Sequence, residues 1–319
     1  MSAHSSLTPS SPVRRRPGLL QILLALIWTL GVPVGIHAQA PAPLLQAADL
    51  QYLGAIRVPG GTFGSSTFEY GGTAPAFHAA NNSLFLVGHP YQTQVAELSL
   101  PTPVNSGSLS ALPTAKVLQP FTDPSHGLMF TVGAGTTYTG GLLEYQNRLV
   151  GTSYLYYDGT GGQSLSHFVN TNPGSLAAGT AQGMYKVGSV GAGFVDGYMG
   201  LIPPEWQTAL GGPVLTGQCC IPIISRTSYG PAVFAFDPAN LGVTNPAPAK
   251  PLVYYPQSNP LADYAATSVL FNGATAITGV VFPGGTRSVL FFGRQGQGPF
   301  CYGPGTADPS LAGTPAPGG

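Results

Sequence analysis

Glycine and proline interrupt this chain so often that they restrict what it can fold into. The 319 residues include 45 glycines and 32 prolines, together close to a quarter of the chain. Both residue types are costly inside helices and common in turns, because glycine reaches left-handed backbone conformations and proline lacks an amide donor. The glycines do not recur at every third position, which excludes a collagen-like triple helix. With 43% hydrophobic residues available for a core, the chain is typical of a turn-rich β protein.

Charged side chains are scarce. Asp, Glu, Lys and Arg make up 7% of the residues and balance to a net charge of zero, whereas soluble domains usually carry about 25%. Because a basic surplus is needed to neutralise a phosphate backbone, we expect no nucleic acid among the partners. The chain also lacks the charge-rich, aromatic-poor stretches that stay disordered.

Residues 1–40 have the pattern of a secretory signal peptide. Three basic residues, Arg14–Arg16, precede an apolar run at Leu19–Leu30. Ala38-Gln39-Ala40 then supplies the small residues that a signal peptidase accepts. An uncleaved anchor is the alternative, but the apolar run is short for a bilayer span of about 20 residues. We therefore predict cleavage after Ala40.

The chain that remains after cleavage is mildly acidic. It keeps eight cations against eleven acids, a net charge of −3. No second apolar run in it is long enough to span a bilayer. We expect a secreted or periplasmic protein that has no membrane partner once the signal peptide is removed.

Short apolar runs bounded by turn residues predict strands along most of the mature chain. The clearest pair is a hairpin: Ser83–Gly88 follows an Asn-Asn turn, and Gln94–Leu100 alternates until Pro101 stops it. The one helix expected is Pro203–Leu210, because proline is tolerated in a first helical turn. The other expected strands are Leu50–Val58, Arg148–Tyr157, Ile221–Arg226, Ala232–Asp237, Thr275–Phe282 and Arg287–Gly293.

One segment of the sequence recurs near its end. Thr73–Gly88 aligns without a gap with Thr278–Gly293, 205 residues later. Shorter versions of the same strand ending at Arg148–Gly151 and Cys219–Ser225 space the copies by about 60–70 residues. Four such units predict an all-β, β-propeller-like repeat of antiparallel sheets over residues 41–302. A pair of two-sheet sandwiches is the alternative.

The sequence resembles secreted bacterial β-propeller proteins of uncharacterised function. The signal peptide, Ala79–His89 and Val95–Ser99 carry this resemblance, which extends over most of the mature chain. The resemblance implies a propeller fold and brings no catalytic motif with it.

The last segment, residues 303–319, contains no predicted strand and ends in Pro315-Ala316-Pro317-Gly318-Gly319. In a propeller the last blade must meet the first. We therefore expect this segment to be either a Gly/Pro-rich tail or a truncated blade, which would leave the propeller incomplete.

Three cysteines, Cys219, Cys220 and Cys301, are available for disulfides in an oxidising compartment. Either Cys301 pairs with Cys219 or Cys220, or the two neighbours pair with each other. No spacing of cysteines or histidines fits a zinc site. We expect no metal and no cofactor.

Aromatic and histidine side chains are the candidates for ligand binding. His89 follows a predicted buried strand and precedes Pro90, so a loop could present it to a ligand, although a hydrogen-bonded turn histidine fits the position too. Tyr154 and Tyr156 should share one face of a predicted strand, with Tyr157 on the other. Exposed tyrosines stack well on sugar rings, whereas buried ones would pack between sheets.

Carboxylates are the candidates for catalysis. A glycosidase uses two of them, one as acid and the other as nucleophile or base, and we take Glu144 and Asp158 as candidates for such a pair. Asp158 begins an Asp-Gly-Thr-Gly-Gly segment that lacks the ladder of calcium ligands, so a glycine turn is favoured there.

Two functional hypotheses follow from the sequence. The first is an exported, non-catalytic binding or surface-interaction module whose partner is an extracellular glycan or protein. Scarce charge and the lack of a catalytic constellation favour it. The alternative is an extracellular carbohydrate-active enzyme, a glycoside hydrolase or lyase that uses paired carboxylates.

Overall fold

The computed structural model describes residues 42–133, 137–158, 160–220, 228–261 and 275–296. The expected signal peptide, residues 1–40, lies outside these ranges. The chain divides into two units, Met1–Pro41 and Ala42–Gly319. Within the described part of the second unit, sixteen strands form five antiparallel sheets, and there is one α-helix. The all-β expectation is confirmed.

The first four-stranded sheet is a meander in which each strand pairs with the next along the chain. Its strands are β3 (Thr73–His78), β4 (Ser83–Val87), β5 (Val95–Ser99) and β6 (Val117–Thr122). The β4–β5 hairpin is the one expected from the sequence. Nearly all residues of β4 and β5 are buried, which explains why both runs are so apolar. A small hairpin of β1 (Thr62–Phe63) and β2 (Ser66–Thr67) precedes this sheet.

The second sheet is another meander of four strands. Its strands are β7 (Thr137–Tyr145), β8 (Arg148–Leu155), β9 (His167–Asn170) and β10 (Ala181–Tyr185). Only Gln146 and Asn147 connect β7 to β8, with φ of 50° and 58°. Positive φ at both positions is the geometry of a type I′ turn, which fixes the register of the hairpin.

The third and fourth sheets continue the same order along the chain. The third sheet contains β11 (Met199–Leu201), β12 (Val214–Thr216), β13 (Val233–Phe236) and β14 (Ala249–Val253), and the fourth contains β15 (Ala276–Val281) and β16 (Leu290–Arg294). The predicted helix is confirmed as α2 (Pro204–Leu210), which ends at Gly211 in the left-handed region. Short 3-10 helices lie at Ala47–Asp49, Leu109–Ala111, Leu128–Thr131, Ala192–Phe194 and Pro238–Asn240.

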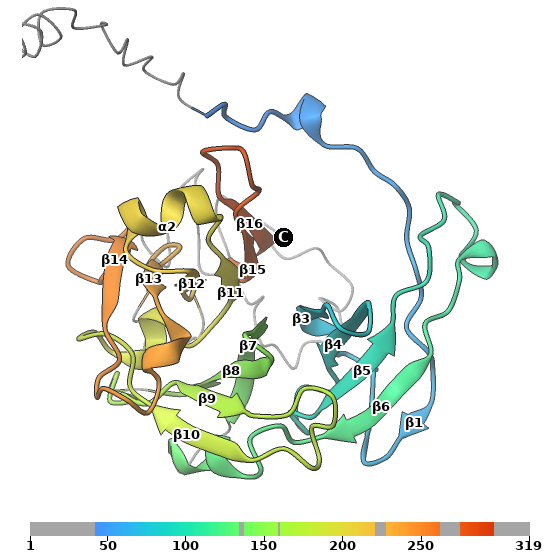
Figure 1. Ribbon diagram of the computed structural model, residues 1–319, viewed down its shortest axis with the longest axis horizontal. Coiled ribbons are helices and arrows are strands. Elements are labelled where there is room, and N and C mark those ends of the chain that lie inside the picture. The colour runs from blue at the N-terminus through green and yellow to red at the C-terminus, as the bar shows by residue number, and fades with distance from the viewer. Residues whose placement is uncertain (1–41, 134–136, 159, 221–227, 262–274, 297–319) are drawn as a thin grey trace, which may run out of the picture. The chain divides into compact units, whose positions relative to one another are not determined.

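The first strands of these four sheets contact one another, and the later strands lie further out (Figure 1). The approach is closest where β7 meets the segment before β11. A Cβ atom at Gly140 would lie 1.9 Å from the backbone oxygen of Asp196. Glycine at this position therefore allows the two segments to pack backbone against backbone.

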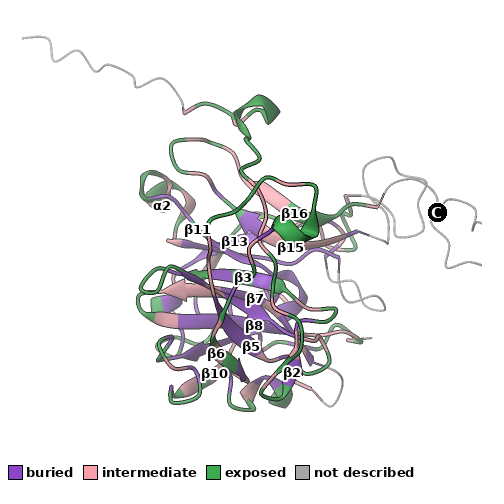
Figure 2. Cartoon of the chain, turned by 90° about the vertical axis from the view of Figure 1, so that its right-hand side faces the viewer, coloured by how far each residue is buried: buried purple, intermediate pink, exposed green. Residues whose placement is uncertain are grey.

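The core lies between neighbouring sheets rather than in one centre. Phe85 and Val87 of the first sheet pack with Leu142 and Leu149 of the second. Similar clusters join the second sheet to the third and the third to the fourth. Buried residues therefore follow the strands, and the exposed ones lie mainly in loops (Figure 2).

Three strand predictions need correction. Leu50–Val58 is not a strand, because no neighbouring strand pairs with it beyond the isolated bridges of Ala55 and Arg57. The strand expected from Arg287 begins only at Leu290, because the Arg287 amide donates to the Pro43 oxygen instead of a partner strand. The strand expected at Arg148–Tyr157 ends at Leu155, and Tyr156 and Tyr157 follow it in a turn. The strand expected at Ile221–Arg226 lies outside the described residues.

Candidate functional site

A cavity of about 130 Å³ lies where the N-terminal ends of β3, β7 and β15 come together. Side chains from three sheets line it, among them Thr73, Tyr138, Tyr154, Gln218 and Thr278. It shares Thr73, Ala74 and Thr278 with a larger cavity of about 400 Å³, which Leu142, Met199 and Val280 make mostly apolar. No charged side chain is among the residues that line the smaller cavity.

Seven rings form a connected aromatic cluster beside this cavity. From one end to the other they are Tyr70, His89, Tyr91, Tyr138, Tyr154, Tyr156 and Tyr157. Tyr138 is the centre, with ring centroids 6.3 Å from Tyr91, 5.6 Å from Tyr154 and 5.8 Å from Tyr156. The structure therefore brings together His89, Tyr154 and Tyr156, the three candidates for ligand binding.

Strand register explains the central part of the cluster. Tyr138 on β7 lies directly opposite Tyr154 on β8, and directly opposed aromatic residues pack against each other in antiparallel sheets. Tyr157 is exposed and contacts Tyr156 alone among the other rings of the cluster. Tyr138 was missed in the sequence because its strand was not predicted.

His89 occupies a hydrogen-bonded turn. Its backbone oxygen accepts hydrogen bonds from the amides of Gln92 and Thr93, and its Nδ1 accepts one from the Tyr91 amide at 3.3 Å. The imidazole also contacts the Tyr70 ring at 5.8 Å, edge to face. His89 thus fixes the loop that carries exposed Tyr91 and packs against exposed Tyr70 from the turn between β2 and β3.

Behind the cavity, Gln218 connects it to a buried acid. The Gln218 amide donates to Asp196 Oδ1 at 3.1 Å, and Gln218 Oε1 accepts from the Cys219 amide at 3.0 Å. Burial raises the pKa of Asp196 well above its ordinary value. Burial, together with the nearby charge of Asp196, also raises the pKa of Tyr154. Both shifts favour the neutral forms of these groups, and no charged side chain lines the smaller cavity.

Cys219 and Cys220 form a disulfide with each other. Of the pairings that the sequence left open, the structure contains the vicinal one, while Cys301 lies outside the described residues. Cys219 also forms a backbone bridge with Ile277, a residue that lines the smaller cavity. The disulfide thus lies directly behind the wall of the site.

The two candidate catalytic acids are far apart. Glu144 lies opposite Leu149, whereas Asp158 follows the other end of β8 at Leu155, about 20 Å along the strand. A glycosidase pair needs about 5–10 Å. Glu144 accepts a hydrogen bond from the Ala79 amide. Asp158 accepts from the backbone of Gly162 and Gln163, as in the predicted glycine turn.

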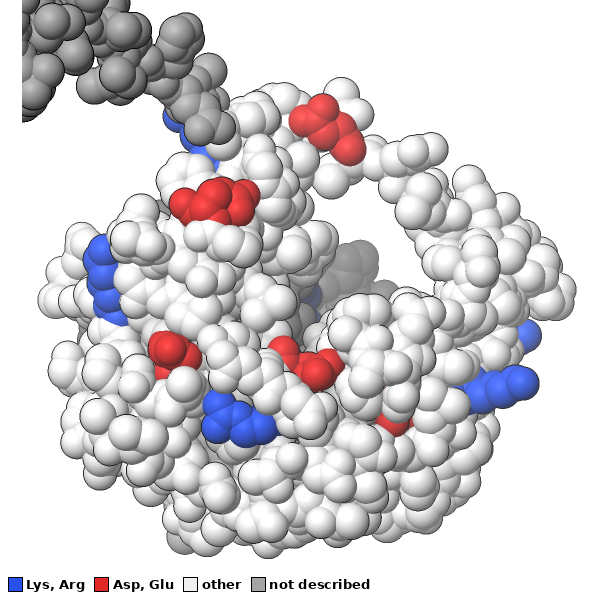
Figure 3. All heavy atoms as spheres, viewed as in Figure 1, with Lys and Arg blue, Asp and Glu red and all other residues white. Residues whose placement is uncertain are grey.

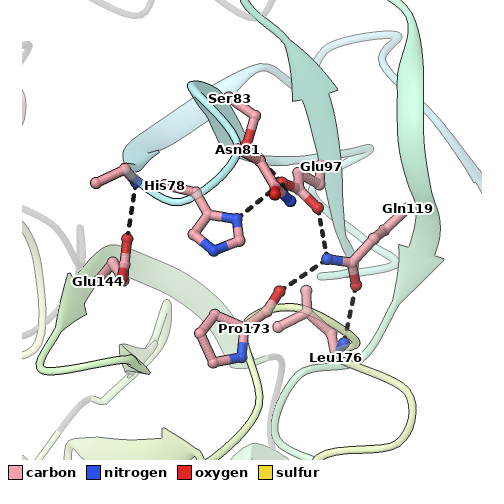
Figure 4. A network of polar contacts seen from close by, with 9 residues as sticks. His78, Asn81, Ser83, Glu97, Gln119, Glu144, Pro173 and Leu176 are labelled. Carbon is pink, nitrogen blue, oxygen red and sulfur yellow. Dashed lines mark hydrogen bonds and ion pairs between the residues drawn. The ribbon is translucent and has the colours of Figure 1, made fainter.

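A second polar cluster surrounds Glu97 in the first sheet (Figure 4). The carboxylate accepts hydrogen bonds from His78, Asn81, Ser83 and Gln119. Burial alone would raise the pKa of Glu97, but these four donors outweigh it and hold the pKa below 4.5. Because His78 and Glu97 are only 2% and 1% exposed, this Glu97 network is structural.

The Glu97 network also joins two sheets. Gln119 donates to the Pro173 oxygen and accepts from the Leu176 amide. Pro173 and Leu176 belong to the loop between β9 and β10 of the second sheet. The network therefore holds the first sheet against the second.

Charge is as sparse on the surface as in the composition. On the face shown in Figure 3, Lys, Arg, Asp and Glu are scattered among uncharged residues. Within the described ranges, no three His, Cys, Asp or Glu side chains gather as a metal site. Nor does any helix there have the length and apolar character needed to cross a membrane.

Comparison with known proteins adds no relative. No family model matches the chain, and neither the curated proteins nor the solved structures gave a match. Functional inference therefore rests on the geometry described above.

Proposed function

We propose that this protein is an exported, non-catalytic binding module and that the aromatic cluster is its binding surface. The observation that carries the proposal is the cluster itself. Tyr70, Tyr91 and Tyr157 expose 86%, 76% and 61% of their surface beside a cavity. Rigid tyrosines that present this much area are typical of binding surfaces.

We further propose that the sheets form a propeller-like repeat. In support, three sheets are four-stranded meanders of the same order, and the first strands of all four contact one another. The recurring segments Thr73–Gly88 and Thr278–Gly293 both fall on the first two strands of a sheet. Such an arrangement gathers loops from several sheets at one end, where they can form a common binding surface.

Export is part of the same proposal. The signal-peptide pattern of residues 1–40 supports a secreted or periplasmic location. A disulfide between Cys219 and Cys220 is compatible with an oxidising compartment. The partner would then be an extracellular glycan or protein.

A carbohydrate-active enzyme is the second candidate, and one observation favours it. The charge of Asp158 adds to the burial that raises the pKa of Asp196. A neutral acid near an ionised one is the division of roles that glycosidases use. In such an enzyme the catalytic pair would be Asp158 and Asp196, and Glu144 would not take part.

The binding proposal is tested with the exported full-length protein on arrays of extracellular glycans and proteins. We expect binding that falls at least tenfold in the Tyr70→Ala/Tyr91→Ala variant. Tyr52→Ala is the matched control, because Tyr52 is 65% exposed and outside the cluster. Equal binding by both variants would refute the proposed surface. Release of a sugar product that Asp196→Asn abolishes would favour the enzyme instead.

A further inference from the structure

The lining of the smaller cavity restricts the charge of its ligand. Its polar side chains are threonines, tyrosines and one glutamine. Sites for anions usually present Arg or Lys, and sites for cations present carboxylates. A cavity lined by neither kind fits a neutral ligand.

Hydroxyl groups in the cavity are available to such a ligand. The phenols of Tyr138 and Tyr154 and the hydroxyls of Thr73 and Thr278 have no hydrogen-bond partner among the described residues. Each can both donate and accept a hydrogen bond. A ligand with hydroxyl groups of its own would satisfy all four.

The exposed tyrosine rings of the cluster require that the ligand also have a flat apolar face. The exposed faces of Tyr70 and Tyr91 are flat and apolar, and they lie within the same connected cluster as Tyr138. A pyranose ring has C–H groups on its faces and hydroxyl groups around its rim. It can therefore stack on a phenol ring while its rim forms hydrogen bonds.

We propose that the cavity and the aromatic cluster bind a neutral carbohydrate chain. One sugar ring lies against Tyr138 and Tyr154 in the cavity, and further sugars stack on Tyr70 and Tyr91. The cavity of about 130 Å³ suits one ring rather than a drug-sized ligand, which needs about 300–1,000 Å³. This inference rests on the proposed binding function and adds the class of ligand.

A proline-rich peptide is the rival occupant, since such peptides dock in aromatic-lined grooves. It would cover the outer rings of Tyr70 and Tyr91. It has no ring of hydroxyl groups to place in the cavity, so the hydroxyls of Tyr138 and Tyr154 would stay without partners. The described contacts therefore favour the carbohydrate.

The test is calorimetric titration of the exported protein with three kinds of probe. These are neutral hexasaccharides of glucose, mannose and xylose, an acidic hexagalacturonate, and a decaproline peptide. We expect binding of at least one neutral hexasaccharide. Its affinity should change less than about twofold between roughly 50 and 500 mM salt, because no charge pairing is involved.

Conservative variants separate binding from folding. Tyr138→Phe and Tyr154→Phe remove only hydroxyl groups and should each weaken binding about three- to tenfold. Tyr70→Ala removes a stacking face and should weaken it about tenfold. Tyr52→Phe should stay within twofold of wild type. Unchanged thermal unfolding of the phenylalanine variants shows that the fold is kept.

The outcomes distinguish this inference from the proposed function. Binding of hexagalacturonate or decaproline alone, lost in the cluster variants, would overturn the neutral carbohydrate and keep the binding surface. Binding that none of the cluster variants weakens would overturn both. Failure of every neutral hexasaccharide to bind would overturn the ligand class.

Discussion

Replacing Glu97 with glutamine is expected to lower the free energy of unfolding by roughly 3 kcal/mol. Glu97 Oε1 accepts hydrogen bonds from His78 at 2.8 Å, from Asn81 at 2.9 Å and from Ser83, while Oε2 accepts from Gln119. A hydrogen bond to a charged group contributes about 1.5–3 kcal/mol, against about 1 kcal/mol for a neutral pair. Loss of the charge therefore weakens every contact in the network.

The substitution also places one amide against another. If the new oxygen takes the Oε1 position, the new nitrogen faces Gln119 Nε2, and both are donors. Gln119 cannot turn its amide, because Nε2 also donates to Pro173 and Oε1 accepts from Leu176. One buried donor is left unsatisfied, at a cost of about 1–3 kcal/mol. Added to the weaker hydrogen bonds, this gives the expected loss.

Thermal unfolding followed by circular dichroism measures the effect. A loss of 3 kcal/mol in a domain of this size should lower Tm by about 6–12 °C. Glu144→Gln is the matched control, because half-buried Glu144 accepts one hydrogen bond, from the exposed Ala79. It should cost less than about 1 kcal/mol. If the two variants unfold within about 0.5 kcal/mol of each other, the reasoning about the network is wrong.

The pH dependence gives an independent check on the charge. The folded pKa of Glu97 lies below the ordinary value of 4.5. Its contribution to stability is therefore complete above that value and is lost as the pH falls through the folded pKa. The difference in Tm between wild type and Glu97→Gln should shrink as the pH falls from about 5 to about 3. A constant difference would mean that ionised Glu97 does not stabilise the fold.

Three further predictions follow from single contacts. Iodoacetamide without a reductant should leave Cys219 and Cys220 unlabelled, and peptide mapping should find them joined to each other; a bridge from either to another cysteine would contradict this. Gly140→Ala should lower the free energy of unfolding by about 3 kcal/mol or more, because its Cβ atom would lie 1.9 Å from a backbone oxygen. Gly107→Ala is the control and should cost little, because no atom lies within 4 Å of a Cβ atom there. Similar Tm values for the two variants would refute the close packing. Burial raises the pKa of Asp196 well above 3.8, so the stability of the wild type relative to Asp196→Asn should fall as the pH rises above about 4. Parallel pH profiles of the two proteins would contradict this.

Uninterrupted apolar runs made part of the fold predictable from the sequence. Strands β4 and β5 were found because both are short, apolar and bounded by turn residues. Strand β7 was missed because Gly140 and Gly141 in its centre are typical of a turn. In the fold, Gly140 instead allows a close backbone approach. Local sequence does not distinguish these two uses of glycine.

Two other strands were not predicted because each contains a proline, which is usually excluded from strands. Strand β6 contains Pro120 and β14 contains Pro251. Both strands lie at the edge of their sheets, where a missing amide donor is tolerated. Whether a strand is central or at an edge depends on sheet order, which the local pattern does not contain.

The candidate site was only partly predictable. Tyr154 and Tyr156 were found because they lie at and just beyond the end of a recognisable strand, but Tyr138 reaches them only through the β7–β8 register. Tyr70 and Tyr91 lie in turns, where nothing in the sequence indicates that Tyr91 contacts Tyr138 of the second sheet and that Tyr70 contacts His89. Contacts between sheets therefore decide the composition of the site.

The Glu97 network and the smaller cavity lie at opposite ends of strand β4. Ser83, in the Glu97 network, begins β4, and Val87, which lines the smaller cavity, ends it, about 13 Å away. At the Ser83 end the donors are all paired with one carboxylate, which stabilises the packing of the sheets. At the Val87 end the hydroxyls of Tyr138 and Tyr154 have no hydrogen-bond partner among the described residues. Substitutions at the two ends should therefore affect different properties. Glu97→Gln should lower Tm and keep the affinity of the folded protein, whereas Tyr138→Phe should weaken binding and keep Tm.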